Sequence, residues 1–304
     1  TKIMNKKAFN GLMMVIVLLL SAGCSTENGD GNESSHVANQ QVNLSFYQMV
    51  IQPLEDAQAK TRADEGSTAT DLKNSSFSYL DITLIPTNGK SKTIVFKQKK
   101  EDNAKDNFGH VSMQVPVGEY NMVAVASKNP NVQINSMEEV VFPDKVTDMA
   151  AICQKITVKE GSNSFNCDLK RAVAKFSIAN TGESSKVAKN LKMHFSGNCS
   201  NKWNPTTGLA AGVSKVEPEL DVKEQYSLFS AYVFLSSAEE KNIKVEAEIF
   251  DSEGSLLKSL SFDDVHLKTN YVTRYSGDLF GLSGTADFTF SEGEFPDSGT
   301  GKDF

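Results

Sequence analysis

The sequence predicts an all-β protein, and three observations support this. Apolar and polar residues alternate with a period of two along most of the chain, whereas the spacing of an amphipathic helix is scarce. Short turn signals rich in Gly, Asn, Asp and Ser separate the alternating segments. The apolar fraction is a modest 39%, which suits sheets with solvated outer faces. Strands at this spacing, with few helices between them, indicate β-sandwiches.

The first expected strand runs through Val42, Leu44 and Phe46 towards Ile51, because these apolar residues alternate with polar ones. A turn at Thr87-Asn88-Gly89 closes the next strand, since Asn-Gly readily adopts positive φ. The charged residues 97–107 are expected to form a solvated loop. The other strands of this first series are expected at residues 80–84, 93–96, 111–117, 120–126, 140–142, 152–158 and 164–169.

A second series of strands begins at Arg171. Its segments are expected at residues 172–178, 191–195, 226–235, 243–249, 256–262, 271–280 and 288–290, with a hairpin turn at 251–254. The sequence therefore divides into one sandwich over residues 76–170 and a second over 171–290. Residues 291–304 form an acidic, Gly-rich tail that is expected to fray.

The N-terminal 23 residues have the form of a bacterial lipoprotein signal. Lys6 and Lys7 precede an apolar run from Phe9 to Leu20, which is too short for a membrane span of ~20 residues. The run closes on Leu20-Ser21-Ala22-Gly23-Cys24, where small residues precede a thiol able to carry diacylglycerol. Cys24 is thus predicted to be the lipidated mature N-terminus. The alternative is an ordinary secretory signal with a chance cysteine.

Residues 24–75 are expected to form a tether that contains the early strand. The segment 25–35 is polar, acidic and Gly-rich, so it has little to bury. The whole chain has a net charge of −7 and no basic patch, which argues against a nucleic-acid partner.

The sequence predicts no enzyme, no metal and no cofactor. His36, His110, His194 and His266 are scattered, and none has the spacing of a metal site. No Gly-x-Ser-x-Gly elbow or phosphate loop is present. A lipoprotein hydrolase would need two of His110, His194 and His266 to approach a shared carboxylate or serine in the fold.

Three cysteines follow Cys24, an odd number for an exported protein. Cys153 and Cys167 flank a predicted hairpin around residues 160–163, so they are candidates for a disulfide across it. The alternative is that both, together with Cys199, are small buried hydrophobic residues.

Trp203 is the only tryptophan, and it lies in the polar segment 200–208. A ring presented by such a loop could stack on a sugar. The alternative is that the ring covers a domain interface or the edge of a core.

Four features together resemble one known family, and a fifth is consistent with it. The features are the lipobox ending at Cys24, Lys60-Thr61-Arg62-Ala63, Val115-Pro116-Val117-Gly118-Glu119-Tyr120 with the apolar run 122–126, Leu169-Lys170-Arg171-Ala172-Val173-Ala174-Lys175-Phe176, and Leu267-Lys268-Thr269-Asn270-Tyr271-Val272-Thr273 leading to 277–280. In this order they resemble the fimbrillin-like proteins of Bacteroidales, which build type V pili.

The resemblance implies two tandem transthyretin-like β-sandwich domains after a flexible lipidated tether. It implies a fimbrial component, anchor or accessory subunit, on the outer membrane and cell surface, which supports cell adhesion. The expected partners are other fimbrial subunits, bound by strand exchange, and a host protein or glycan. The resemblance also implies processing between Arg62 and Ala63, which would release the strand at 42–51. In the alternative, Arg62 is an exposed linker residue. The rival function is a surface glycan-binding lipoprotein using Trp203.

Overall fold

The computed structural model describes residues 38–51, 67–89, 91–102, 107–281 and 288–294. Cys24, Arg62 and Ala63 lie outside the described residues, as do the signal peptide and the tail from residue 295. Lipidation and processing therefore remain predictions.

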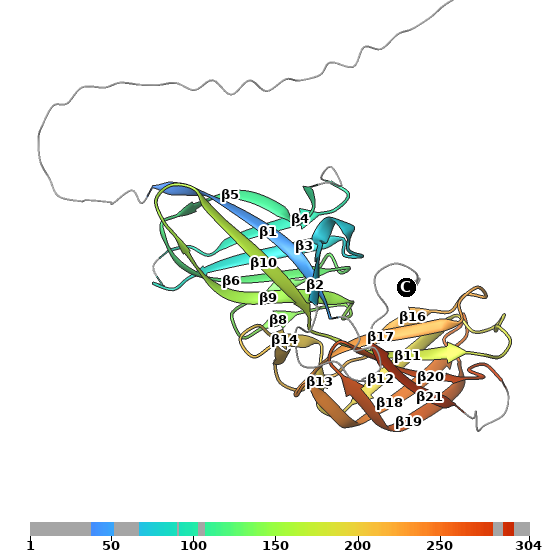
Figure 1. Ribbon diagram of the computed structural model, residues 1–304. Coiled ribbons are helices and arrows are strands. Elements are labelled where there is room, and N and C mark those ends of the chain that lie inside the picture. The colour runs from blue at the N-terminus through green and yellow to red at the C-terminus, as the bar shows by residue number, and fades with distance from the viewer. Residues whose placement is uncertain (1–37, 52–66, 90, 103–106, 282–287, 295–304) are drawn as a thin grey trace, which may run out of the picture. The chain divides into compact units, whose positions relative to one another are not determined.

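The structure confirms the all-β fold (Figure 1). The described residues form one short 3-10 helix, η1 (Leu72–Asn74), and otherwise strands in four sheets. The strands are β1 (Asn39–Ile51), β2 (Ser67–Asp71), β3 (Tyr79–Pro86), β4 (Ile94–Lys99), β5 (His110–Pro116), β6 (Gly118–Ser127), β7 (Gln133–Ile134), β8 (Val140–Val141), β9 (Met149–Val158), β10 (Asn163–Arg171), β11 (Ala174–Asn180), β12 (Asn190–Ser196), β13 (Cys199–Ser200), β14 (Lys202–Asn204), β15 (Leu209–Ala210), β16 (Glu219–Asp221), β17 (Leu228–Leu235), β18 (Glu239–Phe250), β19 (Leu256–Lys268), β20 (Tyr271–Gly277) and β21 (Thr289–Glu294).

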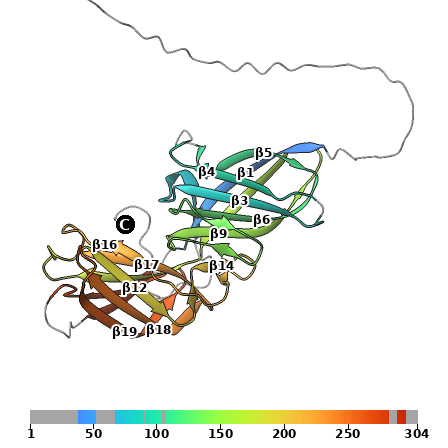
Figure 2. The same cartoon turned by 180° about the vertical axis from the view of Figure 1, so that it is seen from behind.

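The N-terminal strands form one sheet that folds over its own core. Its order is β2-β1-β10-β9-β6-β3-β4, and β5 pairs with β1. Figure 1 shows β1, in blue, beside β10 and β5, and Figure 2 shows β3, β6 and β9 from behind. Alternate residues of β1, β3, β6 and β10 turn into a common apolar cluster, as the period-two pattern predicts. Tyr120 lies within it and donates its hydroxyl hydrogen to the Pro116 carbonyl, at 2.9 Å.

The predicted hairpin over residues 152–169 does not stay paired along its length. β9 and β10 pair only where Ala150 and Ala151 meet Arg171 and Lys170. Beyond that point β9 pairs with β6, and β10 pairs in parallel with β1. The turn at 160–163 is present, but the two strands separate beyond Ala151 and Lys170 and each pairs with another strand of the sheet.

The C-terminal strands form two sheets, with orders β13-β17-β11-β20-β21 and β16-β12-β18-β19. Both contribute side chains to a second core. Phe176 of β11 is fully buried there, and its ring lies 5.7 Å from the rings of Phe195 and Phe262, in edge-on geometry.

A fourth, small sheet draws strands from both sides of residue 171, in the order β15-β14-β8-β7. A third apolar cluster accompanies it, with Val140, Phe142, Val173, Trp203 and Phe234 among its members. The division into domains at residue 171 remains a prediction.

Arg171 links two of the sequence motifs by direct contact. Its Nε and Nη2 atoms donate to Asp148 Oδ1 and Oδ2 at 2.7 and 3.0 Å, and its Nη1 donates to Asn270 Oδ1 at 3.3 Å. Asn270 adopts a φ of 67°, a left-handed turn conformation that asparagine tolerates. Its backbone N–H donates to the Val173 carbonyl, so the turn before β20 is tied to the start of β11.

Candidate functional site

β1 is the element around which the candidate site is built, because its backbone is paired along both edges. On one edge Val42–Gln48 run parallel to Asn163–Leu169 of β10. On the other edge Asn39–Ser45 pair with β5, and Tyr47–Ile51 then pair with β2. Loss of β1 would therefore leave backbone donors and acceptors of three strands without partners.

A glycine marks the position where β1 changes partner from β5 to β2. The Phe46 N–H donates to the Gly109 carbonyl at 2.9 Å. Gly109 has a φ of 94°, and a Cβ atom there would lie 2.7 Å from the Leu72 Cβ. Only glycine fits this close approach without moving η1.

The inward side chains of β1 fill the N-terminal core. Val42 and Phe46 are fully buried and Leu44 is 1% exposed, and all three belong to the same apolar cluster. Burying each such side chain contributes about 1.5–3 kcal/mol relative to leaving it in water. The vacated position of β1 would thus be an apolar groove lined by unpaired strand edges.

The outer face of β1 carries a polar cluster centred on His110 of β5. The His110 ring lies 3.2 Å from Ser45 Oγ of β1 through Nδ1, and 3.2 Å from Asp71 Oδ2 at the end of β2 through Nε2. Sequence reasoning missed this cluster because its members come from three separate strands. It joins β1 to both of the strands on that edge.

The Ser45, His110 and Asp71 trio does not have the surroundings of a serine nucleophile. Ser45 lies in the middle of a strand whose backbone is paired with His110 on one side and Asn166 on the other. The backbone N–H groups around Ser45 belong to this paired sheet and are not free to stabilise an oxyanion. The trio is therefore a hydrogen-bonded brace between strands.

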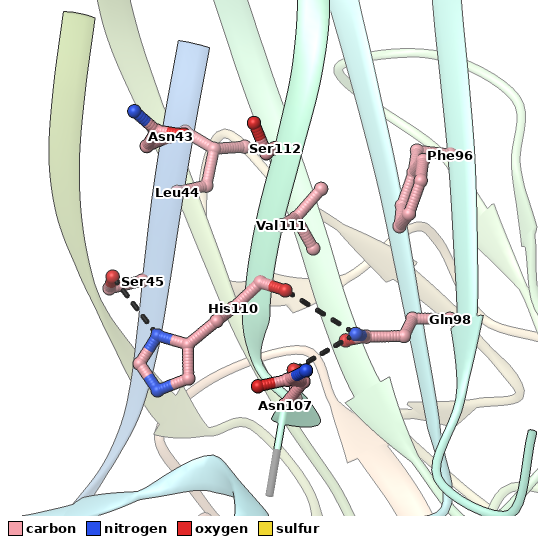
Figure 3. A pocket seen from close by; sticks show the side chains of 9 residues that line it. All are labelled: Asn43, Leu44, Ser45, Phe96, Gln98, Asn107, His110, Val111 and Ser112. Carbon is pink, nitrogen blue, oxygen red and sulfur yellow. Dashed lines mark hydrogen bonds between the residues drawn. The ribbon is translucent and has the colours of Figure 1, made fainter. Parts of the chain in front are cut away.

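A cavity of about 410 Å³ lies next to this brace, and Figure 3 shows the side chains that line it. Val111 of β5 and Phe96 of β4 face the space between these two strands, while the His110 ring turns away towards β1 (Figure 3). Gln98 closes one end of the space. Its Nε2 donates to the Asn107 carbonyl at 3.0 Å, and its Oε1 accepts the Gly109 N–H at 2.9 Å.

The other two described histidines lie apart from this site and share no carboxylate with His110 or with each other. His194 lies between Glu217 and Glu248, at 2.6 and 2.9 Å. His266 lies between Glu239 and Glu292, at 2.8 and 3.4 Å. The condition for a hydrolase site, two histidines at one carboxylate or serine, is not met among the described residues. No group of three or more metal-ligating side chains with suitable geometry occurs among them either.

The His194 cluster predicts a pH dependence of stability. Hydrogen bonds from the Lys215 ammonium and then from His194 hold the pKa of Glu217 below its ordinary value of 4.5. A carboxyl whose pKa is lower in the folded state adds stability above pH 4.5, and that stability is lost as the pH falls through the folded pKa. Glu217→Gln is expected to flatten the loss of stability below pH 4.5, measured by urea unfolding across pH. An equal effect of Glu138→Gln, an exposed control, would contradict this.

The predicted Cys153–Cys167 disulfide is wrong for this structure, because both thiols are free. Cys167 is buried in the core beneath β1, whereas Cys153 packs against the third cluster with Trp203. The residue beside Cys167 on β9 is Gln154, whose Nε2 lies 3.5 Å from the sulfur. The register that aligns Lys170 with Ala151 places Gln154, and not Cys153, opposite Cys167, so the two cysteines lie on opposite faces and point into different cores.

Buried thiols predict a graded reactivity. Burial, followed by Asp168, raises the pKa of Cys167 to about 12, and burial raises the pKa of Cys199 to about 11. Thiolate is the reactive form, so both should resist alkylation in the native protein. In a Cys24→Ala chain, iodoacetamide is expected to modify half-buried Cys153 first, and the other two only after unfolding, as read by peptide mass spectrometry. Modification of all three at equal native rates would contradict the burial.

Trp203 is buried, so the prediction of an exposed stacking ring is wrong. The residue is 3% exposed, lies on β14 opposite Val140 of β8, and belongs to the third apolar cluster. Its ring cannot meet a sugar in this structure. The alternative reading, a ring that covers a core, is the one the structure supports.

The described part of the chain has no helix with the length and apolar character needed to cross a bilayer.

Several solved structures match much of the chain at low identity. The tip fimbrial protein Mfa3 from Porphyromonas gingivalis, with a C-terminal truncation, matches at 9% identity and a TM-score of 0.40, over 84% of this chain and 100% of that one. A provisionally named cell adhesion protein from Parabacteroides distasonis matches at 9% identity and a TM-score of 0.45, over 85% of this chain and 99% of that one. A provisionally named polysaccharide-binding protein from Bacteroides thetaiotaomicron matches at 9% identity and a TM-score of 0.45, over 84% of this chain and 98% of that one.

No curated protein sequence matches the chain significantly. A family model, described as a family of unknown function (DUF6562), matches residues 35–293. This match spans all four sheets of the structure. The chain therefore belongs to the DUF6562 family.

Proposed function

We propose that this protein is a non-catalytic component of a fimbria on the cell surface, an anchor or accessory subunit that supports adhesion to a host protein or glycan. Lipid on Cys24 holds it on the outer membrane. It joins partner subunits by exchange of a β-strand at the position of β1. The resemblance of its motifs to fimbrillin-like proteins supports this role.

The observation that carries the proposal is the placement of β1. This strand is near the N-terminus, is paired on both edges, and buries Val42, Leu44 and Phe46 in the core. A strand from another subunit could replace it only if it supplied the same backbone hydrogen bonds and the same alternate apolar side chains. Backbone pairing would give affinity, and the side-chain pockets would give specificity.

The order of elements suits removal of this one strand. β1 ends at Ile51 and β2 begins at Ser67, so Arg62 and Ala63 fall between two strands that pair with each other. Cleavage after Arg62 would separate β1 from the rest of the chain and leave β2 in place. Repeated head-to-tail donation of a strand is a contact that does not close, and it builds a filament.

The alternative function, glycan binding, depended mainly on an exposed Trp203, and that residue is buried. No other described feature favours that function over strand exchange.

Mass spectrometry of the native N-terminus tests the proposed function, with sheared filaments and washed outer membranes analysed separately. Acylated Cys24 in membranes, with filament subunits co-purifying, is the result expected for an anchor. A free Ala63 in the filament fraction would instead identify a processed subunit that polymerises. Acylated protein without any filament association would overturn the fimbrial role.

A further inference from the structure

Gln48 is a polar residue on the inward face of β1. By the two-residue alternation of a strand it shares this face with Val42, Leu44 and Phe46. Its neighbour on β10 is Leu169, which is fully buried in the same core. Gln48 itself is only 4% exposed.

The side-chain carbonyl of Gln48 lacks a hydrogen-bond partner within the described part of the chain. A buried amide oxygen without a partner loses its bonds to water and gains nothing in return. The other three buried positions of β1, Val42, Leu44 and Phe46, carry apolar side chains that belong to the core. Position 48 is thus a mismatch between β1 and the groove in which it lies.

We propose that Gln48 makes β1 a replaceable strand, and that the groove prefers an incoming strand with apolar side chains at all four of its buried positions. This inference rests on the proposed exchange at β1. The preferred partner is an extended segment of another chain with apolar residues at four alternate positions. The first three are of the size of Val, Leu and Phe, and the fourth is of the size of Met or Leu. Such a strand gains the backbone pairing of β1 without burying an unpaired amide.

The mismatch at Gln48 favours replacement of β1 by a fully apolar strand over the reverse exchange. While β1 is covalently attached, its high local concentration keeps it in the groove despite Gln48. Once the connection is cut, a fully apolar competitor should displace it. Relief of one buried unpaired group corresponds to a preference of about ten-fold or more.

The test uses the full chain with Cys24→Ala and a specific protease site inserted within residues 52–66, cut after folding. Fluorescent peptides of residues 38–51 then compete for the groove, either with the native Gln48 or with Gln48→Met or Gln48→Leu. The two substituted peptides are expected to bind at least about ten-fold more tightly than the native peptide. A peptide with Gln41→Leu is the control, because Gln41 is exposed on the outer face, and its affinity should match that of the native peptide.

Equal binding of the native, Gln48→Met and Gln48→Leu peptides would overturn the role of Gln48 while leaving strand exchange intact. A gain for Gln41→Leu as large as that for Gln48→Leu would also overturn it, since general hydrophobicity would then explain both. If no peptide enters the groove, strand exchange itself fails. As a second readout, Gln48→Met in the uncut chain should slow hydrogen exchange of the β1 amides about ten-fold, and unchanged rates would count against the proposal.

Discussion

Replacing Arg171 by alanine is expected to destabilise the protein by about 3–5 kcal/mol, among the largest effects of any single substitution. The Arg171 side chain is 13% exposed and its partner Asp148 is 4% exposed. Without the guanidinium, the Asp148 carboxylate is left buried with no opposite charge. Urea unfolding of the Cys24→Ala chain would measure the difference in unfolding free energy.

An exposed ion pair supplies the control for Arg171. Lys155 and Glu119 lie 2.6 Å apart but are 56% and 51% exposed, so Lys155→Ala should cost less than about 1 kcal/mol. A double variant, Arg171→Met with Asp148→Leu, should recover much of the loss, since it removes both charges together. A loss for Arg171→Ala no larger than that for Lys155→Ala would contradict this account of the clamp.

Replacing Phe46 by alanine is expected to cost about 3–5 kcal/mol and to loosen β1 specifically. Phe46 is fully buried and lies where β1 changes partner. Its removal leaves a cavity under the strand proposed to exchange, so hydrogen exchange of the β1 amides should speed up more than that of β11.

Phe176→Ala is the matched control for Phe46→Ala, because Phe176 is equally buried in the C-terminal core. It should reduce overall stability by a similar amount, about 3–5 kcal/mol, yet leave the local protection of β1 unchanged. Similar loosening of β1 by both variants would show that β1 does not open as a separate unit.

Local patterns were enough to predict the longer strands, but not β2 or the short strands β7 and β13 to β16. The alternation of Val42, Leu44 and Phe46 identified both β1 and its inward face, because a strand with one buried face must alternate. The turn at Asn88-Gly89 likewise lies between β3 and β4, with Gly89 at a φ of 64°. β2 was not predicted, because Ser67–Asp71 contain no apolar alternation and pair through their backbone with β1.

Long-range pairing was beyond the local pattern. The turn at residues 160–163 predicts two adjacent strands, but it does not show that β1 pairs with β10 instead. The register of β9 and β10, which places Gln154 and not Cys153 beside Cys167, was equally invisible to the local pattern. Trp203 was misjudged for the same reason: its polar neighbours predict a loop, while its pairing partner Val140 is distant in sequence.

The candidate site also combines residues that the local sequence predicts with residues that only the long-range pairing brings together. The inward apolar residues of β1 could be read from the sequence, whereas the brace of Ser45, Asp71 and His110 could not. The burial of Gln48 and its unpaired carbonyl became apparent only in the structure, since both depend on the strands packed around it.

Native mass spectrometry of the cut chain, incubated with an isotope-labelled peptide of residues 38–51, tests strand exchange most directly. The account predicts that the labelled peptide replaces the original β1 fragment one for one, and that the remaining chain stays folded only while the groove is filled. A remaining chain that stays folded with the groove empty, and takes up no labelled peptide, would contradict the central claim.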